Sequence, residues 1–358
     1  MQKVKIFFLI LFVSCLTAGL STAIAEKRSP VPAKKAATPK KNLIIEEYKL
    51  FSANKIYEVD CSEPGSCVPK ASFKNREKWR NINYIQEYNN TIKPLGYRFA
   101  KEKARFAYEL YKGTNLIFSG LTDIRGFNEN ASKTKFMFTA DYGNESYGTD
   151  GPTYQTGGTG LFVDMKFNKS PLTHTIAGMY YLGEQIIKIE PSKKTGAAKY
   201  YKYSGKQYTE EVYEIYLDNK SIYEFAGLDF PNAVLQAFYV YNEHWILEYS
   251  KPEINGGRLV GSYGTVVVDG KNLNDKNHYT EMFSHGYIKD ELFYFFRDKK
   301  GGIRISYAGK TLPDKYDEVM HYSGGFYVNL NPAWNRNMIS FYGLKNNFWY
   351  YVEAGIYE

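Results

Sequence analysis

Residues Gly264–Lys310 read GTVVVDGKNLNDKNHYTEMFSHGYIKDELFYFFRDKKGGIRISYAGK, a series of short apolar and aromatic runs separated by turns. The same order of landmarks occurs earlier in the chain, in Gly160–Lys206, and the landmark glycines of the two segments are 104 residues apart. Repetition at a fixed interval is typical of a repeat architecture, and strand-rich units of about 40 to 50 residues are typical of β-propeller blades.

A shorter interval lies within the longer one. The segments HWILEY at 244, ELFYFF at 291 and NMISFY at 337 follow one another after 47 and 46 residues. Tyrosine (34) and phenylalanine (23) are abundant, and aromatic residues favour strands. We therefore predict an all-β fold, a β-propeller of four-stranded blades. Six blades are preferred and seven are the alternative, while a β-sandwich or a β-solenoid would be a different all-β solution.

The first 25 residues have the pattern of a secretory signal peptide. MQKVK is cationic, IFFLILFVSCLTAGL is apolar, and Ala23 and Ala25 form an A-x-A cleavage site. A lipoprotein signal acylated at Cys15 is the alternative, although Phe12 fits it poorly. The pattern predicts export to a periplasmic, extracellular or cell-surface location.

Residues 26–42, EKRSPVPAKKAATPKKN, have no apolar periodicity and predict a flexible linker. They carry six lysine or arginine residues, so most of the formal net charge of +8 lies in the first 42 residues. Two roles remain open for the linker, a solubilising spacer or an electrostatic contact with an anionic cell envelope. The body is nearly neutral, which argues against a nucleic-acid surface.

Residues 43–358 are predicted to form the propeller domain, with residues 43–104 as its least regular part. The ordered chain begins with the strand-like LIIEEYKLF and ends with NNFWYYVEAGIYE. Ring closure often joins both chain ends in one blade, which removes open strand edges. We therefore expect these two segments to pair.

After removal of the signal peptide only Cys61 and Cys67 remain, on either side of SEPGS. The Pro-Gly turn brings the thiols together, and exported proteins meet an oxidising compartment, so a disulfide is predicted. A zinc site is the weaker interpretation, because histidine partners at ligand spacing are missing.

Motifs for catalysis or cofactor binding fail on inspection. Gly309-Lys310-Thr311 lacks the leading glycine of a phosphate-binding loop, and neither H-E-x-x-H nor G-x-S-x-G occurs. Asp164 and Asp269, at equivalent repeat positions, fit turns better than catalytic acids. The histidines are His174, His244, His278, His285 and His321. The positions of His278, His285 and His321 in the repeat account for them, and a metal site assembled from different blades is the alternative. No catalytic residue, metal ligand or cofactor is therefore predicted.

The Gly-rich segment 141–160, DYGNESYGTDGPTYQTGGTG, has no equally long counterpart in the repeat. Loops carry function on a repeated scaffold, so we predict a binding loop in which Tyr142, Tyr147, Tyr154 and Asp150 contact a glycan or a peptide. An idle surface loop is the alternative. Trp245, Trp334 and Trp349 lie in strand-like runs and are predicted to be core residues.

The repeats at Gly264–Lys310 and Gly160–Lys206, behind a signal peptide, resemble those of exported bacterial β-propeller repeat proteins. The resemblance covers most of the chain after about residue 105, and it implies an architecture rather than an activity. We expect a monomeric, non-catalytic binding or scaffolding protein of the cell envelope, with an envelope protein, a peptide or a glycan as partner. The alternative is a propeller enzyme, a hydrolase or lyase acting on polysaccharide or peptide.

Overall fold

The computed structural model places one compact unit at Asn42–Glu358. The described residues are 43–56, 68–69, 84–102, 107–148, 151–164, 166–170, 178–192, 199–203, 206–228, 234–256, 258–335 and 337–356. The signal peptide, the linker, Cys61, Cys67 and Asp150 lie outside these residues, so the predictions made for them stay predictions.

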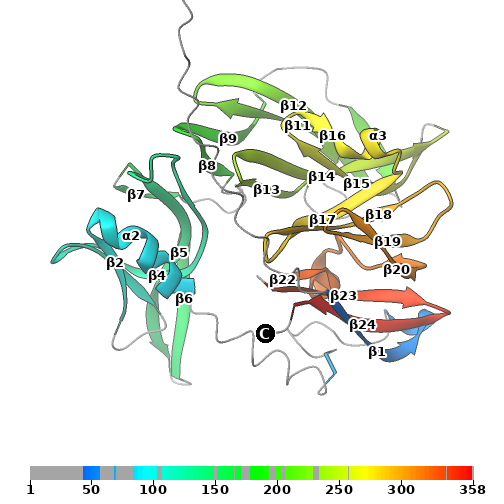
Figure 1. The fold of residues 1–358 in the computed structure, drawn as a ribbon, viewed down its shortest axis with the longest axis horizontal. Helices are drawn as coiled ribbons and strands as arrows, with labels where there is room; N and C mark the ends of the chain where they lie inside the picture. Colours follow the sequence, from blue (N-terminus) through cyan, green and yellow to red (C-terminus); the bar gives the residue numbers. More distant parts are fainter. Residues whose placement is uncertain are drawn as a thin grey trace, which may run out of the picture. The chain divides into compact units, whose positions relative to one another are not determined.

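The described strands form five antiparallel sheets, which confirms the all-β class. We number the sheets in the order in which the chain completes them (Figure 1). The first sheet contains β2 (Tyr97–Lys101), β3 (Tyr108–Lys112), β4 (Asn115–Glu129), β5 (Phe136–Gly148), β6 (Gly151–Val163) and β7 (Lys166–Ser170). The second contains β8 (Met179–Leu182), β9 (Gln185–Pro191), β10 (Tyr200–Tyr203), β11 (Lys206–Leu217) and β12 (Lys220–Leu228).

The third and fourth sheets have four strands each, as predicted for all of them. The third contains β13 (Leu235–Tyr241), β14 (His244–Asn255), β15 (Arg258–Val268) and β16 (Lys271–Asn272). The fourth contains β17 (Glu281–Ile288), β18 (Glu291–Arg297), β19 (Ile303–Tyr307) and β20 (Lys310–Tyr316). The fifth contains β1 (Ile44–Ser52), β21 (Glu318–Val319), β22 (Ala333–Asn335), β23 (Met338–Lys345) and β24 (Phe348–Gly355).

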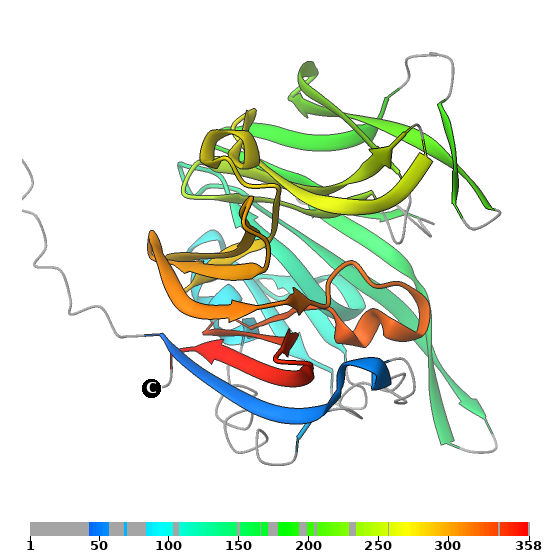
Figure 2. The ribbon, with the colours of Figure 1, turned by 90° about the vertical axis from the view of Figure 1, so that its right-hand side faces the viewer.

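The expected pairing of the first and last strands is present. β1 runs antiparallel to β24, from Ile44 opposite Gly355 to Lys49 opposite Tyr350, and Figures 1 and 2 show the two strands side by side. The Tyr316 hydroxyl of the fourth sheet donates to Glu47 of β1 at 2.7 Å. β1 therefore contacts two elements from late in the chain: β24, with which it pairs, and Tyr316 at the end of β20.

The three segments spaced by 47 and 46 residues occupy matching places. HWILEY begins β14, ELFYFF lies in β18 and NMISFY covers the start of β23, and each is a central strand with a partner on either side. Asp164 and Asp269 both have a φ of 49°, in hairpin turns that follow β6 and β15. They are turn residues, as the sequence indicated.

The least regular part contains a helix that sequence periodicity did not define. α2 (Tyr84–Ile92) places Ile85, Tyr88 and Ile92 against the core of the first sheet. The Asn89 side chain then accepts a hydrogen bond from the Phe99 N–H at 2.6 Å and donates to the Phe99 carbonyl at 2.9 Å. The remaining helical pieces are η1 (Ala53–Lys55), η3 (Lys93–Leu95), α3 (Leu273–Asn277) and η4 (Gly325–Leu330).

Segment 141–160 is a hairpin rather than the predicted loop. β5 and β6 stay paired from Phe138 opposite Phe162 to Gly148 opposite Gly151, with a bulge after Tyr142. Gly160 suits this hairpin because a Cβ there would come within 2.4 Å of the Phe167 ring on the neighbouring strand β7. The break in the repeat is thus a pair of extended strands.

Neighbouring sheets pack through aromatic and aliphatic side chains. One buried cluster includes Ile187 and Ile215 of the second sheet and Leu247 of the third, and another includes Phe295 of the fourth and Phe341 of the fifth, whose rings are 4.8 Å apart. Polar side chains also lie between the sheets. Glu248, His285 and His321 are buried or partly buried where the third sheet, the fourth sheet and the segment before β23 meet.

Candidate functional site

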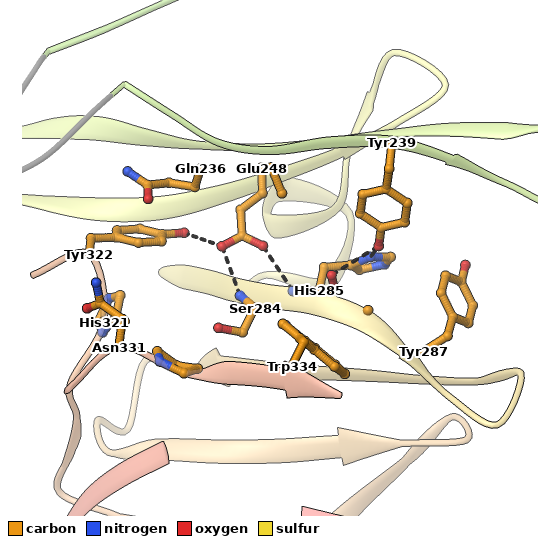
Figure 3. Close-up of a pocket in the computed structure, with 13 residues that line it drawn as sticks. Gln236, Tyr239, Glu248, Ser284, His285, Tyr287, His321, Tyr322, Asn331 and Trp334 are labelled. Atoms are coloured by element: carbon orange, nitrogen blue, oxygen red, sulfur yellow. Dashed lines mark hydrogen bonds between the residues drawn. The ribbon is translucent and has the colours of Figure 1, made fainter. Parts of the chain in front are cut away.

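A cavity of about 370 Å³ opens between the third sheet, the fourth sheet and the segment that precedes β23 (Figure 3). The third sheet contributes Gln236, Ala237, Tyr239 and Glu248, the fourth contributes Ser284, His285, Gly286 and Tyr287, and the fifth-sheet region contributes His321, Tyr322, Asn331, Pro332 and Trp334. Cavities with aromatic walls and a few convergent polar groups are the usual ligand sites of proteins. We call it the Trp334 cavity.

Glu248 is the central polar residue of this cavity. β14 is buried on both faces from Trp245 to Ser250, and Glu248 shares a face with Ile246, which packs against Met282 of the fourth sheet. The carboxylate accepts hydrogen bonds from the Tyr322 hydroxyl at 2.7 Å and from the Ser284 and His285 N–H groups at 2.9 Å each. Figure 3 shows all three donors converging on it.

The two backbone donors come from a β-bulge. The register of β17 shifts between Phe283 and Gly286, and Ser284 has a φ of 48°, so two consecutive N–H groups turn away from the ladder. Burial raises the pKa of Glu248, and its hydrogen bonds, together with the nearby charge of His321, offset only part of that rise. Glu248 therefore holds the bulge and the Tyr322 segment together.

His321 and Glu281 form a second buried pair beside it. The His321 Nε2 lies 3.0 Å from the Glu281 carboxylate, and the Nδ1 lies 2.7 Å from the Val319 carbonyl oxygen. Both partners can only accept, so both ring nitrogens donate and the ring is an imidazolium. Its face stacks on Phe283 at 3.8 Å between centroids. Arg297 Nε donates to the other Glu281 oxygen at 3.2 Å.

The pKa values agree with this geometry. Burial alone would raise the pKa of Glu281, but the charges and hydrogen bonds of His321 and Arg297 outweigh it and lower the pKa to about 2. Burial alone would lower the pKa of His321, yet Glu281 and the Val319 carbonyl raise it. The pair is ionised at neutral pH.

His285 is the opposite case. Burial lowers the pKa of His285 to about 4, so the ring is neutral at pH 7. Its Nδ1 lies 2.8 Å from the Tyr239 hydroxyl, which also lies 3.0 Å from the His285 carbonyl oxygen. The hydroxyl thus fixes both the ring and the backbone of this residue.

Trp334 forms a platform at the edge of the cavity. Its indole lies against Gly286, where a Cβ would come within 2.6 Å of the ring, and meets Phe293 edge-on at 5.6 Å. The side chain is nevertheless 40% exposed. The prediction of a core role is correct for Trp245 and Trp349, which are buried. It is wrong for Trp334, because Gly286 and Phe293 cover only part of its ring.

The groups around the cavity are poorly arranged for acid–base chemistry. His321 cannot take a proton from the Ser284 hydroxyl, because both of its nitrogens already donate elsewhere. Both Glu248 oxygens are also engaged. Within the described ranges, no group of three or more His, Cys, Asp or Glu side chains has a geometry that would hold a metal ion.

The predicted binding residues lie elsewhere, in the β5–β6 hairpin. Tyr142 is half-buried and packs edge-on against Phe118 and Phe167, at 6.1 and 5.9 Å between centroids. The side chains of Tyr147 and Tyr154 are outside the described part of the structure, as is Asp150. Ligand contact by these residues stays a prediction.

The chain matches no protein-family model and no curated protein. Among the described residues, no helix is long and apolar enough to cross a bilayer.

Proposed function

We propose that the chain is an exported, non-catalytic binding protein of the cell envelope, and that its sheets are the blades of a propeller closed by the β1–β24 pair. Five sheets are described, so the expectation of six blades, or of seven, stays a prediction. The export pattern of residues 1–25 and the basic segment 26–42 support a periplasmic or extracellular location.

We further propose that the Trp334 cavity holds an uncharged glycan. The exposed indole is the observation that carries this proposal, because the C–H face of a sugar ring stacks well on a fixed aromatic surface. Gln236 and Ser284 add an amide and a hydroxyl group to the lining of the same cavity, and such groups suit sugar hydroxyls. The charged pairs are committed to internal contacts, so the cavity does not call for a charged ligand.

Replacing Trp334 by alanine should weaken glycan binding about tenfold, which corresponds to about 1.4 kcal/mol of lost stacking. The measurement is calorimetric titration of the full chain with uncharged β-1,4-linked N-acetylglucosamine oligomers. Gly286→Ala should weaken binding too, because the added Cβ would displace the Trp334 indole from its position against residue 286. Tyr200→Ala is the control, since Tyr200 is an aromatic residue that is 59% exposed on β10.

Equal affinity for the oligomers in the natural chain and in Trp334→Ala would refute this ligand assignment. Binding of a short neutral peptide instead, with the same sensitivity to Trp334, would keep the cavity as a binding site and change the ligand class.

One observation favours the enzymatic alternative. Glu248 lines the Trp334 cavity and has a raised pKa, which is the direction that a general acid requires. The fate of the ligand separates the two functions. A binding protein should leave N-acetylglucosamine oligomers intact during incubation with the natural chain, whereas an enzyme should shorten them, and chromatography of the oligomers measures the difference.

A further inference from the structure

The outer part of the β5–β6 hairpin is a ribbon of only two strands. β4 pairs with β5 only as far as Tyr142, and β7 pairs with β6 only from Thr159 onward. Beyond these points β5 and β6 stay paired with each other up to the turn after Gly148, and Figure 2 shows them running on together past the rest of the first sheet. Among the described residues, no other strand pairs with this part of the hairpin. We call residues 143–148 of β5 the open edge.

Pro152 determines which backbone groups of the ribbon face outward. Tyr147 lies opposite Pro152, and proline has no N–H, so these two residues cannot exchange a pair of hydrogen bonds. Hydrogen-bonded and non-hydrogen-bonded pairs alternate along an antiparallel ladder, so Glu145 and Tyr147 both turn their N–H and C=O groups away from β6. The Gly143 carbonyl has the same phase, since it faces β4, where a Cβ on Gly120 would lie 3.0 Å from its oxygen.

The open edge lacks the protection that other edges of this fold have. An unpaired strand edge attracts another strand, and lysine or proline on the edge is a common protection. The opposite edge of the ribbon has Pro152, whereas the open edge has the sequence GNESYG, with neither residue type. Lysine occurs on each of the edge strands β2, β7, β12, β16 and β20. The open edge is therefore available for a strand from a partner.

We propose that the open edge binds an extended peptide of a partner protein, which adds to β5 as a third strand. The outward N–H and C=O groups of Glu145 and Tyr147 match the backbone of another β-strand, so a peptide fits this edge and a glycan does not. A third strand also stabilises the ribbon, because two strands alone are marginally stable in water.

Charge defines the peptide more closely. Residues 143–158 include two carboxylates, Glu145 and Asp150, and no lysine or arginine. A cationic peptide is complementary to this charge, whereas a second copy of the same ribbon would bring like charges together. The partner is therefore a cationic extended peptide rather than a second copy of the chain.

Hydrogen exchange of the full chain tests the phase of the ribbon. The amides of Glu145 and Tyr147 should exchange at least tenfold faster than those of Asn144 and Ser146, which bond to β6. Addition of the acetylated and amidated peptide KTVTVTK should slow the two outward amides. Equal exchange at all four amides, or no slowing by the peptide, would contradict the proposal.

Calorimetric titration of the full chain compares three peptides. KTVTVTK should bind, ETVTVTE should bind at least fivefold more weakly, and KTVPVTK, whose central proline disrupts the strand, should bind at least tenfold more weakly. Equal affinities for the three, or no binding of KTVTVTK at millimolar concentration, would overturn the proposal.

Tyr147→Pro removes one outward N–H from the open edge and should weaken KTVTVTK at least tenfold. Tyr154→Pro is the matched control, because Tyr154 lies opposite Glu145 and the same change there removes an outward N–H from the other edge. It should leave the affinity within twofold, and an equal loss in both variants would overturn the assignment to β5. Trp334→Ala should also leave peptide binding intact, and a loss there would place the peptide in the Trp334 cavity. A dimer of the natural chain in sedimentation that Tyr147→Pro abolishes would make a second copy the partner and refute a foreign peptide.

Discussion

Removal of residues 43–52 is expected to destabilise the whole unit by about 5 kcal/mol or more, a large share of the stability of an ordinary domain. Leu43 and Ile45 pack on the core cluster of the fourth and fifth sheets, and Tyr48, Leu50 and Phe51 pack on a second cluster under β24. Each partly buried apolar side chain contributes about 1 kcal/mol. The deletion also exposes the full edge of β24.

The measurement is thermal unfolding followed by near-ultraviolet circular dichroism. Deletion of residues 26–41 is the matched control, since it shortens the same end of the chain and leaves β1 in place. A synthetic peptide of residues 43–56 added to the truncated protein should restore much of the lost melting temperature. An unchanged melting temperature after the deletion would show that the β1–β24 pair contributes little.

Glu281→Gln is expected to cost about 3 kcal/mol, because it leaves the buried imidazolium of His321 without its counter-charge. The melting temperature should fall by roughly 6 °C or more. Arg297→Gln, which removes the partly exposed cation of the same cluster, should cost only about 1 kcal/mol. The double variant Glu281→Gln with His321→Gln should cost less than the sum of the single changes, and strict additivity would mean that the two residues do not interact.

The cost of Glu281→Gln should also depend on pH. The pKa of Glu281 is lowered from 4.5 to about 2, so its contribution is present above pH 4.5 and is lost as the pH falls towards 2. The pKa of His321 is raised above 6.5, so its contribution is present below pH 6.5 and is lost as the pH rises through the higher folded value. The difference between the natural chain and the variant should be largest between pH 4.5 and 6.5. A difference that is constant from pH 2 to pH 9 would contradict an ionised pair.

Much of the fold could be predicted because its signals are local. Aromatic runs between turn residues mark the strands, and the interval between HWILEY, ELFYFF and NMISFY gives the central strands of three sheets in turn. The hairpin at 141–160 was misjudged because glycine is a poor strand former, and only the paired partner strand explains why it is tolerated. The number of strands in each sheet, which varies from four to six, could not be predicted from local sequence patterns either.

The Trp334 cavity was missed for a different reason. Its lining comes from residues 236–334, and sequence spacing does not show which side chains meet across two sheets. One signal was present in the sequence. Glu248 is the acidic residue in the run HWILEY, which is otherwise mostly apolar and aromatic, and it lies on the same face of β14 as Ile246. A charged residue in a strand buried on both faces requires partners, and those partners proved to be Tyr322 and the bulge of β17.

The β1–β24 pair also determines how long β1 stays unpaired while the chain is synthesised. β1 leaves the ribosome some three hundred residues before its partner β24 is complete. At about 5 to 20 residues per second, β1 waits on the order of fifteen seconds to a minute with its backbone donors and acceptors unpaired. During that interval β1 of the nascent chain is unpaired, and it can pair with β1 of a second nascent chain at the same stage. Slow translation or crowded polysomes should therefore favour mispaired chains, because the exposure ends only when β24 has been made.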